Sequence, residues 1–462
     1  MLETEKKSPI TMNGALLEKL NRGLSDGILQ RWYPLVIDGQ FGGYLTNVTF
    51  DWKLPAQQEK MIVSQARHIW TLSKAAEFFG DSRGYKEMAL HGFVYLRDVM
   101  WDGRYGGFHQ ILDCDGGPSD VKGWREEKRT YGNAFGVYAL AALFGLTGNP
   151  EVLDLARRAF SWIEDHAFDP VGMGYFQFLT REGTPFDRTS EYTTIADDGN
   201  ELGFKDQNSS IHLLEAYTEL YRVWKDDRLR ERLSGILTLI RDTMVGPEGY
   251  LRLFFQPDWR PVSFRNAPPE IRELNYGLDH VSFGHDYETA FLMLEASHVL
   301  GLADDTRTLT VARGMLDHAM AWGWDTGVGG FYDGGYYFAG EERCSIVRDT
   351  KNWWAQAEGL NALLLFSLIC PDDPRYGEYF LKQWKYIDRF ILDHERGDWF
   401  EGGLDKEPHL KTGPKSHIWK CTYHTGRSLM NCIALLSGPE ESRPGIMARK
   451  RALEDLIAHF RH

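Results

Sequence analysis

The chain of 462 residues has 43% hydrophobic and 26% charged side chains and a net charge of −14. This apolar and aromatic content excludes a disordered chain, and the dispersed acidic charge argues against a nucleic-acid partner. The longest apolar run, near residues 363–370, is shorter than the roughly 20 residues that cross a bilayer, so we expect no membrane partner. The N-terminus has no apolar core typical of a signal peptide, and the five cysteines show no CxxC spacing. These features predict a cytoplasmic location and neither a disulfide framework nor a structural zinc.

A pair of amphipathic stretches joined by a short turn recurs six times along the chain. Apolar residues recur in them at helical spacing, as Leu213, Tyr217 and Leu220 illustrate, and Gly, Asn, Asp or Pro residues separate them. The sequence therefore predicts six helical hairpins, formed by residues 62–79 and 85–100, 135–146 and 152–163, 211–224 and 229–244, 287–300 and 309–320, 354–369 and 376–391, and 428–436 and 446–460. A further helix is expected near residues 15–32, and residues 1–12 are expected to form a flexible N-terminus.

The segments between the hairpins are long and share a glycine followed by aromatic residues. Gly107-Phe108, Gly174-Tyr175 and Gly330-Phe331 are examples, and such segments are typical of short strands bounded by turns. Six hairpins with short turns at one end and long connections at the other close most simply into a ring. We therefore expect one domain over residues 1–462, an all-α (α/α)6 barrel whose first helices line the inside and whose long loops carry short β-hairpins. An open α-solenoid is the alternative.

Residues with reactive or aromatic side chains lie near the starts of successive inner helices, where the long connections of a ring would meet. They are Arg67, Asn208, His212, His285, Glu288, Trp353, Trp354, Glu358, Trp419, His424 and Arg427. Loops and element ends on a rigid scaffold often carry binding and catalytic groups. Because His212, His285 and His424 fall at the same place in different repeats, we interpret them as functional residues rather than structural ones.

Several of these residues have other interpretations. Arg67 in an apolar helix is explained equally well by a salt bridge to a buried carboxylate, and Glu288 and Glu358 by the orientation of a His or Arg. His285 and Glu288 also have the i, i+3 spacing of metal ligands on a helix, with His280 nearby. No HExxH motif, P-loop or GxGxxG segment is present, so we expect neither a metal nor another cofactor.

Several segments resemble motifs of the N-acylglucosamine 2-epimerase superfamily, and most of all those of its cellobiose 2-epimerases. These segments are A-R-x-x-W-T at residues 66–71, N-x-x-x-H-L-L-E-A-Y-T at 208–218, S-F-G-H-D-Y-E at 282–288, K-N-W-W-A-Q-A-E at 351–358, G-D-W-F at 397–400 and W-K-C-T-Y-H at 419–424. The matches extend from about residue 40 to about residue 435. The fold of that family is the (α/α)6 barrel.

The resemblance implies inversion at C2 of a reducing-end glucose or mannose residue without a cofactor, on a β-1,4-linked disaccharide such as cellobiose. It implies that His285 and His424 are the acid/base pair and that Glu288 supports His285. It also implies that Arg67 and His212 contact the reacting sugar oxygens. The expected substrate contacts are Asn208, Trp353, Glu358 and Trp419, with Trp354 and Arg427 added because of their position.

Substrate and reaction type have alternatives at this stage. The loops at residues 181–205 and 265–280 are long compared with that family and would reshape the outer sugar subsite, so an epimerase or aldose–ketose isomerase acting on mannose is the first alternative. An inverting glycoside hydrolase using Asp286, Glu288 or Glu358 is the second, and a sugar-binding protein without turnover is the third. The sequence leaves a monomer and a homodimer equally open.

Overall fold

The computed structural model of the chain describes residues 14–118, 127–190, 192 and 201–461. The N-terminal segment expected to be flexible, residues 1–12, and part of the long loop at residues 181–205 lie outside the described residues. Among the residues that are described, no helix combines the length and the apolar character needed to cross a membrane.

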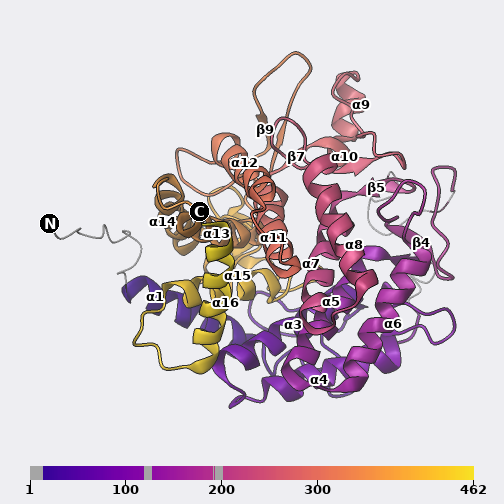
Figure 1. Cartoon of the computed structure of the whole chain (residues 1–462). Coiled ribbons are helices and arrows are strands. Elements are labelled where there is room, and N and C mark those ends of the chain that lie inside the picture. The colour runs from indigo at the N-terminus through magenta and orange to yellow at the C-terminus, as the bar shows by residue number, and fades with distance from the viewer. Residues whose placement is uncertain (1–13, 119–126, 191, 193–200, 462) are drawn as a thin grey trace.

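The six predicted hairpins are present, each made of an inner and an outer helix (Figure 1). The inner helices are α3 (Ile62–Phe79), α5 (Thr130–Thr147), α7 (Gln207–Val223), α11 (Phe283–Leu300), α13 (Trp353–Ile369) and α15 (Tyr423–Leu436). The outer helices are α4 (Tyr85–Tyr95), α6 (Pro150–His166), α8 (Asp227–Leu239), α12 (Thr306–Trp322), α14 (Arg375–Tyr386) and α16 (Pro444–Phe460). Three outer helices continue into π-helical turns, at Leu96–Met100 after α4, Ile240–Met244 after α8 and Ile387–Ile391 after α14.

The inner helices close into a ring. Each packs against the next in the order α3, α5, α7, α11, α13 and α15, and α15 packs in turn against α3. The ring buries most residues of each inner helix, and in α5 every residue from Thr130 to Leu143 is buried. The (α/α)6 barrel is therefore confirmed, and the open solenoid is wrong.

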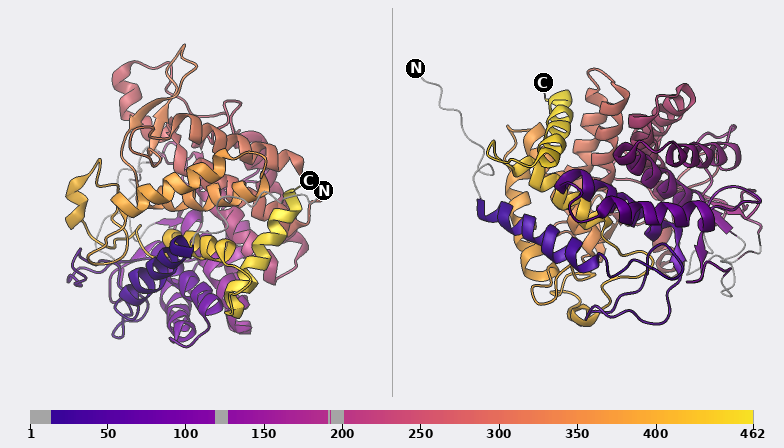
Figure 2. Two further views of the ribbon diagram at one scale, coloured as in Figure 1. Left: turned by 90° about the vertical axis from the view of Figure 1, so that its left-hand side faces the viewer. Right: turned by 90° about the horizontal axis from the view of Figure 1, so that it is seen from below.

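The additional N-terminal helix is also confirmed, in two parts joined by a π-helical stretch. Helix α1 (Gly14–Arg22) leads through Gly23–Leu29 into the short α2 (Gln30–Trp32). Helix α1 packs against α15, so the start of the described chain lies beside the last hairpin of the ring (Figure 2).

The connections contain short strands that tie successive repeats together. These strands are β1 (Lys60–Met61), β2 (Ile111–Leu112), β3 (Glu127–Arg129), β4 (Phe178–Thr180), β5 (Lys205–Asp206), β6 (Phe254–Phe255), β7 (Val281–Ser282), β8 (Gly334–Tyr336) and β9 (Ser345–Arg348). A strand that precedes an inner helix pairs antiparallel with a strand of the next connection, in the pairs β1–β2, β3–β4, β5–β6 and β7–β8. Strands β8 and β9 form a hairpin within one connection. The described parts of the connections also contain short helices that periodicity did not predict: α9 (Pro269–Leu274), α10 (Tyr276–Asp279) and a 3-10 helix at Pro408–Thr412.

A buried lysine anchors most of these connections. Two residues before α3, α5, α7 and α13, its ammonium group contacts an aspartate in the preceding turn and a backbone carbonyl of that turn. The pairs are Lys60–Asp38 at 2.6 Å, Lys128–Asp102 at 3.1 Å, Lys205–Asp169 at 2.7 Å and Lys351–Asp325 at 2.8 Å. Lys415 makes the same contact with Asp393, at 2.7 Å, in the last repeat. Because each pair joins a turn to the start of an inner helix, it fixes the end of the ring at which those helices begin.

Candidate functional site

A cavity of about 340 Å³ lies at the end of the ring where the inner helices begin. Its lining residues are Arg67, Tyr131, Asn208, His212, His285, Glu288, Asn352, Trp353, Trp354, Glu401, His417, Trp419 and His424. Nine of the eleven predicted site residues are among them. The other two, Glu358 and Arg427, are buried outside this lining.

A second cavity, of about 450 Å³, is lined by residues of α3, α7, α15 and α16. Its charged side chains pair with one another, as in the contact of 2.7 Å between Lys74 and Glu219. Of the predicted site residues, only Arg427 reaches it, and it contains no histidine. The smaller cavity, with its concentration of titratable and aromatic groups, is therefore the candidate site.

One ring nitrogen of His424, the second residue of α15, is hydrogen-bonded to a buried carboxylate. Its Nδ1 lies 2.8 Å from Oε1 of Glu358 on α13 and 3.8 Å from Oε1 of Glu288. Burial lowers the pKa of His424 well below its ordinary value, and the charges of Arg67 and Arg427 act in the same direction. At neutral pH the imidazole is therefore uncharged, and Nε2 is left for a group in the cavity.

His285, the third residue of α11, has a different partner. Its Nδ1 forms a hydrogen bond of 2.7 Å with the hydroxyl of Ser282, the residue just before the helix. Burial lowers the pKa of His285 to about 3, and His212 and His280 add to the effect. The indole of Trp354 contacts both candidate catalytic rings, with centroids 4.8 Å from His285 and 5.7 Å from His424. The cavity thus presents two neutral imidazoles beside one indole.

Glu288 does not support His285 as the resemblance implied. The hydrogen bond to His285 comes from Ser282, while Oε1 of Glu288 lies 2.6 Å from Nη2 of Arg427. A buried carboxylate is far more costly without a cation than a neutral imidazole is without a carboxylate. Glu288 is therefore held by Arg427 instead of by the histidine three residues before it.

Arg67, on α3, is buried without an acidic partner. Its guanidinium donates to the hydroxyl of Tyr131 at 2.8 Å and to the carbonyl of Trp419 at 3.1 Å. It also lies 4.4 Å from the ring centre of Phe135 and 5.1 Å from that of Tyr423. In the described part of the chain no carboxylate lies within ion-pair distance of it, so the salt-bridge interpretation fails and the charge is available to the cavity.

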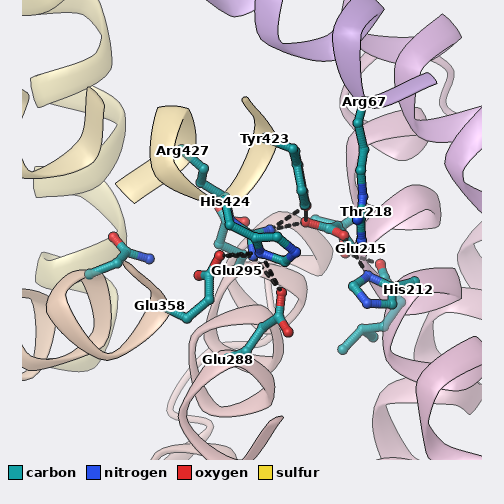
Figure 3. Close-up of polar contacts among 12 residues, drawn as sticks. Arg67, His212, Glu215, Thr218, Glu288, Glu295, Glu358, Tyr423, His424 and Arg427 are labelled. Atoms are coloured by element: carbon teal, nitrogen blue, oxygen red, sulfur yellow. Dashed lines mark hydrogen bonds and ion pairs between the residues drawn. The ribbon is translucent and has the colours of Figure 1, made fainter. Parts of the chain in front are cut away.

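Beneath the cavity, one arginine binds three carboxylates from three helices (Figure 3). Arg427 of α15 contacts Glu288 of α11 at 2.6 Å, Glu358 of α13 at 2.8 Å, and Glu215 of α7. We call these four residues the Arg427 cluster. Arg427 and Glu358, which were expected to contact substrate, are buried and bound to each other outside the lining of the cavity. Glu215 also accepts from Tyr423 and lies 2.9 Å from Nδ1 of His212, which fixes that ring from below.

The electrostatics of the cluster are asymmetric. Burial alone would raise the pKa of Glu215, but Arg427 and His212 outweigh it and lower that pKa to about 2. Burial raises the pKa of Glu358 to about 8, assisted by the negative charge of Glu288 and opposed by Arg427.

Glu288, Glu358 and His424 also approach one another as metal ligands do, with candidate ligand atoms within 4.8 Å. Both carboxylates already bind the same guanidinium nitrogen, Nη2 of Arg427. The guanidinium of Arg427 therefore already supplies the positive charge between these carboxylates, and the donor set does not fit an additional metal ion. His285 and Glu288, which have the helical spacing of metal ligands, do not converge, since the two side chains bind Ser282 and Arg427.

Four cavity residues were not predicted: Tyr131, Asn352, Glu401 and His417. Tyr131 is the second residue of α5, as Asn208 is of α7 and His424 is of α15, so the register of the repeat would have found it. Glu401 and His417 form a pair at 3.0 Å within the connection before α15. No periodic signal marks residues of such a connection.

Comparisons with known proteins identify the family of this chain. Residues 43–426 match the family model described as N-acylglucosamine 2-epimerase (GlcNAc 2-epimerase). The cellobiose 2-epimerase of Bacteroides fragilis is 31% identical over 92% of this chain and 100% of that protein, and one from Ruminococcus albus is 28% identical over 90% and 98%. The solved structure of cellobiose 2-epimerase from Spirochaeta thermophila has a TM-score of 0.74 and 28% identity, covering 91% of this chain and 96% of its own. A D-mannose isomerase structure, 21% identical with a TM-score of 0.74, covers 91% of this chain and 98% of its own and shares the fold. The chain belongs to the N-acylglucosamine 2-epimerase family.

Proposed function

We propose that this protein is a cofactor-independent sugar 2-epimerase that inverts C2 of a reducing-end glucose or mannose residue. The observation that carries the proposal is the pair of neutral histidines, His285 and His424, which come from different helices and line one cavity. The cellobiose 2-epimerases among the relatives support it.

The chemistry requires two acid/base groups and one positive donor. After the sugar ring opens, a base removes the C2 proton to give an enediolate, and an acid returns a proton to the opposite face. An uncharged imidazole can accept that proton, and such a group typically contributes about 10² to 10⁴ in rate. Arg67, bound to the Tyr131 hydroxyl, is placed to stabilise the developing oxyanion.

The remaining cavity residues suit sugar binding. His212, held by Glu215, is assigned to the sugar oxygens that exchange protons when the ring opens. Oδ1 of Asn208 and Nε1 of Trp353 are buried and have no hydrogen-bond partner in the protein, so both are available to sugar hydroxyls. The Trp419 side chain is exposed at the cavity wall, where its ring can cover an outer sugar unit. We therefore assign a β-1,4-linked disaccharide such as cellobiose as substrate.

Hydrolysis on the same scaffold is disfavoured by where the carboxylates lie. An inverting glycosidase needs its two carboxyl groups about 6.5–9.5 Å apart with a water between them. Glu288 and Glu358 instead share one guanidinium nitrogen of Arg427. Asp286 accepts from the backbone of Leu251 at 2.8 Å and lies outside the lining of the cavity. Aldose–ketose isomerisation is the second candidate, because the same enediolate reprotonated at C1 yields a ketose.

Incubation with cellobiose, mannose and glucose in D2O, followed by NMR, tests the proposal. We expect deuterium at C2 together with the inverted epimer, fastest with cellobiose, and we expect the His285→Asn and His424→Asn variants to lose inversion. A ketose product would favour the isomerase, and free glucose from cellobiose without exchange would favour hydrolysis. The absence of any product and any exchange with all three sugars would leave a binding protein.

A further inference from the structure

The Arg427 cluster contains more negative charge than its cation can balance. Three carboxylates face one guanidinium, and the four side chains are between 0% and 3% exposed. Fully ionised, the cluster would have a net charge of −2 (one positive and three negative groups), which is costly away from water. Outside the cluster, the titratable groups that interact with Glu358 include His424 and Cys432 on α15 and Tyr287 on α11, and none of these three supplies a positive charge at neutral pH. The cluster is therefore a place where a proton is retained.

Glu358 is the member best suited to hold that proton. Glu215 accepts from Arg427 and Tyr423 and contacts His212, an environment that favours its ionised form. Oε2 of Glu358, by contrast, is buried without any hydrogen-bond partner, which is unfavourable for a carboxylate. Its raised pKa has the same cause, since burial and the neighbouring Glu288 both disfavour the charge.

We propose that Glu358 stores a proton and exchanges it with His424 through the 2.8 Å contact between Oε1 and Nδ1. When His424 acts as the base, the C2–H bond breaks, its electron pair stays on the sugar as the enediolate, and the proton bonds to Nε2. The Nδ1 proton passes at the same time to the ionised Glu358. When His424 acts as the acid, protonated Glu358 gives its proton to Nδ1 while the Nε2 proton goes to C2. The ring stays neutral throughout, as Arg67 and Arg427 nearby require.

His285 lacks such a partner, so the two histidines are not equivalent. Its Nδ1 is bonded to the hydroxyl of Ser282, which cannot store a proton at neutral pH. His285 therefore gains or loses a charge with each transfer. The enzyme alternates between a state with Glu358 protonated and His285 neutral, and a state with Glu358 ionised and His285 protonated. Each state is ready for one of the two epimers, and proton exchange with water restores the other.

The inference rests on the proposed function and is tested with Glu358→Gln, which keeps the shape and an acceptor for Nδ1 but cannot take up a proton. We expect inversion to fall by about 10² to 10³ in kcat, with little change in KM. One epimer should still exchange its C2 hydrogen with D2O without inverting, because His285 can remove and return that proton. The same substitution at Glu151, which is 64% exposed, is the matched control.

Two results would overturn the relay: inversion within about fivefold of the wild type, or equal loss of exchange for both epimers. Failure of the proposed function looks different, because the wild type itself would then neither invert nor exchange. Infrared difference spectra of wild type against Glu358→Gln at pH 7 should also contain the C=O band of a protonated carboxyl. If that variant does not fold, the band should shift in Glu358→Asp; no such band in either comparison would contradict the stored proton.

Discussion

Buried cations in this protein differ by what they bind. Lys60, Lys205 and Lys351 each contact an aspartate, and Arg427 contacts three glutamates. Arg67 is the exception within the described residues, because its partners are a hydroxyl, a carbonyl and two aromatic rings. A buried charge without a counter-charge is costly. A bound substrate that acquires negative charge in the transition state would supply the counter-charge that Arg67 lacks.

Substitution of Arg67 by Met should therefore affect catalysis more than binding. We expect kcat for epimerisation to fall by about 10² to 10³, as when a donor to a developing oxyanion is removed, with a smaller change in KM. Steady-state kinetics on cellobiose measure both. Arg260→Met, at a side chain that is 78% exposed, serves as the control. Turnover of Arg67→Met within threefold of the wild type would assign the guanidinium a structural role only.

The positions of the site residues could be read from the sequence better than their partners could. His212, His285 and His424 were found because they recur near helix starts. The pairing of His424 with Glu358 joins residues 66 positions apart, and that of Arg427 with Glu215 joins residues 212 apart. The resemblance to the epimerase family instead implied Glu288 as the partner of His285. Only closure of the ring brings the true partners together.

At the scale of elements, apolar periodicity found all six hairpins but placed several inner helices too late. Helix α5 begins at Thr130 and α15 at Tyr423, whereas the apolar pattern predicted starts at residues 135 and 428. The first turns of these helices contain polar residues that are buried at the site, so they break the pattern that marks a core-facing helix. The anchoring lysine lies two residues before the inner helix in four repeats, a regular spacing that also marks the helix start. The connection before α11 has Val281 at this position instead of a lysine, so the spacing is hard to recognise in the sequence.

The anchoring lysines should contribute strongly to stability. In Lys205→Met the carboxylate of Asp169 stays buried without its cation, and breaking a buried pair of this kind costs about 3–5 kcal/mol. We expect a clear decrease in the midpoint of thermal unfolding, followed by circular dichroism. Lys53→Met removes a pair with Asp51 whose lysine is 79% exposed, and should leave the midpoint almost unchanged, because exposed ion pairs contribute little. Equal decreases in the unfolding midpoint of both variants would show that the buried pair contributes no more to stability than the exposed pair does.

At the scale of the whole molecule, closure of the ring buries titratable groups that an open array would leave in water. Burial lowers the pKa of His68, His280 and His285 to about 3 each, and these residues lie on α3, just before α11, and on α11. The same burial raises the pKa of Glu358 to about 8. Both effects favour uncharged forms in the interior, but their consequences for stability have opposite signs.

Stability should decrease as the pH falls below about 6.5, the ordinary histidine pKa. Between about pH 6.5 and pH 3 the three histidines bind protons in the unfolded chain but remain uncharged in the native state. Each therefore removes about 1.4 kcal/mol of stability per pH unit. Glu358 opposes this between about pH 8 and its ordinary pKa near 4.5, because there the native state holds a proton that the unfolded chain releases. Three groups outweigh one, so for these four the net contribution falls toward acid pH.

Differential scanning calorimetry or chemical unfolding from pH 7.5 to pH 5 measures this dependence. The His68→Gln substitution removes one of the three histidines that bind a proton only after unfolding. The slope of the unfolding free energy against pH should therefore become shallower by about 1.4 kcal/mol per pH unit below pH 6.5. The same substitution at His394, a side chain that is 65% exposed, controls for the loss of an imidazole as such. An unchanged slope in His68→Gln, or an equal change in His394→Gln, would mean that enclosure by the ring does not hold this histidine neutral.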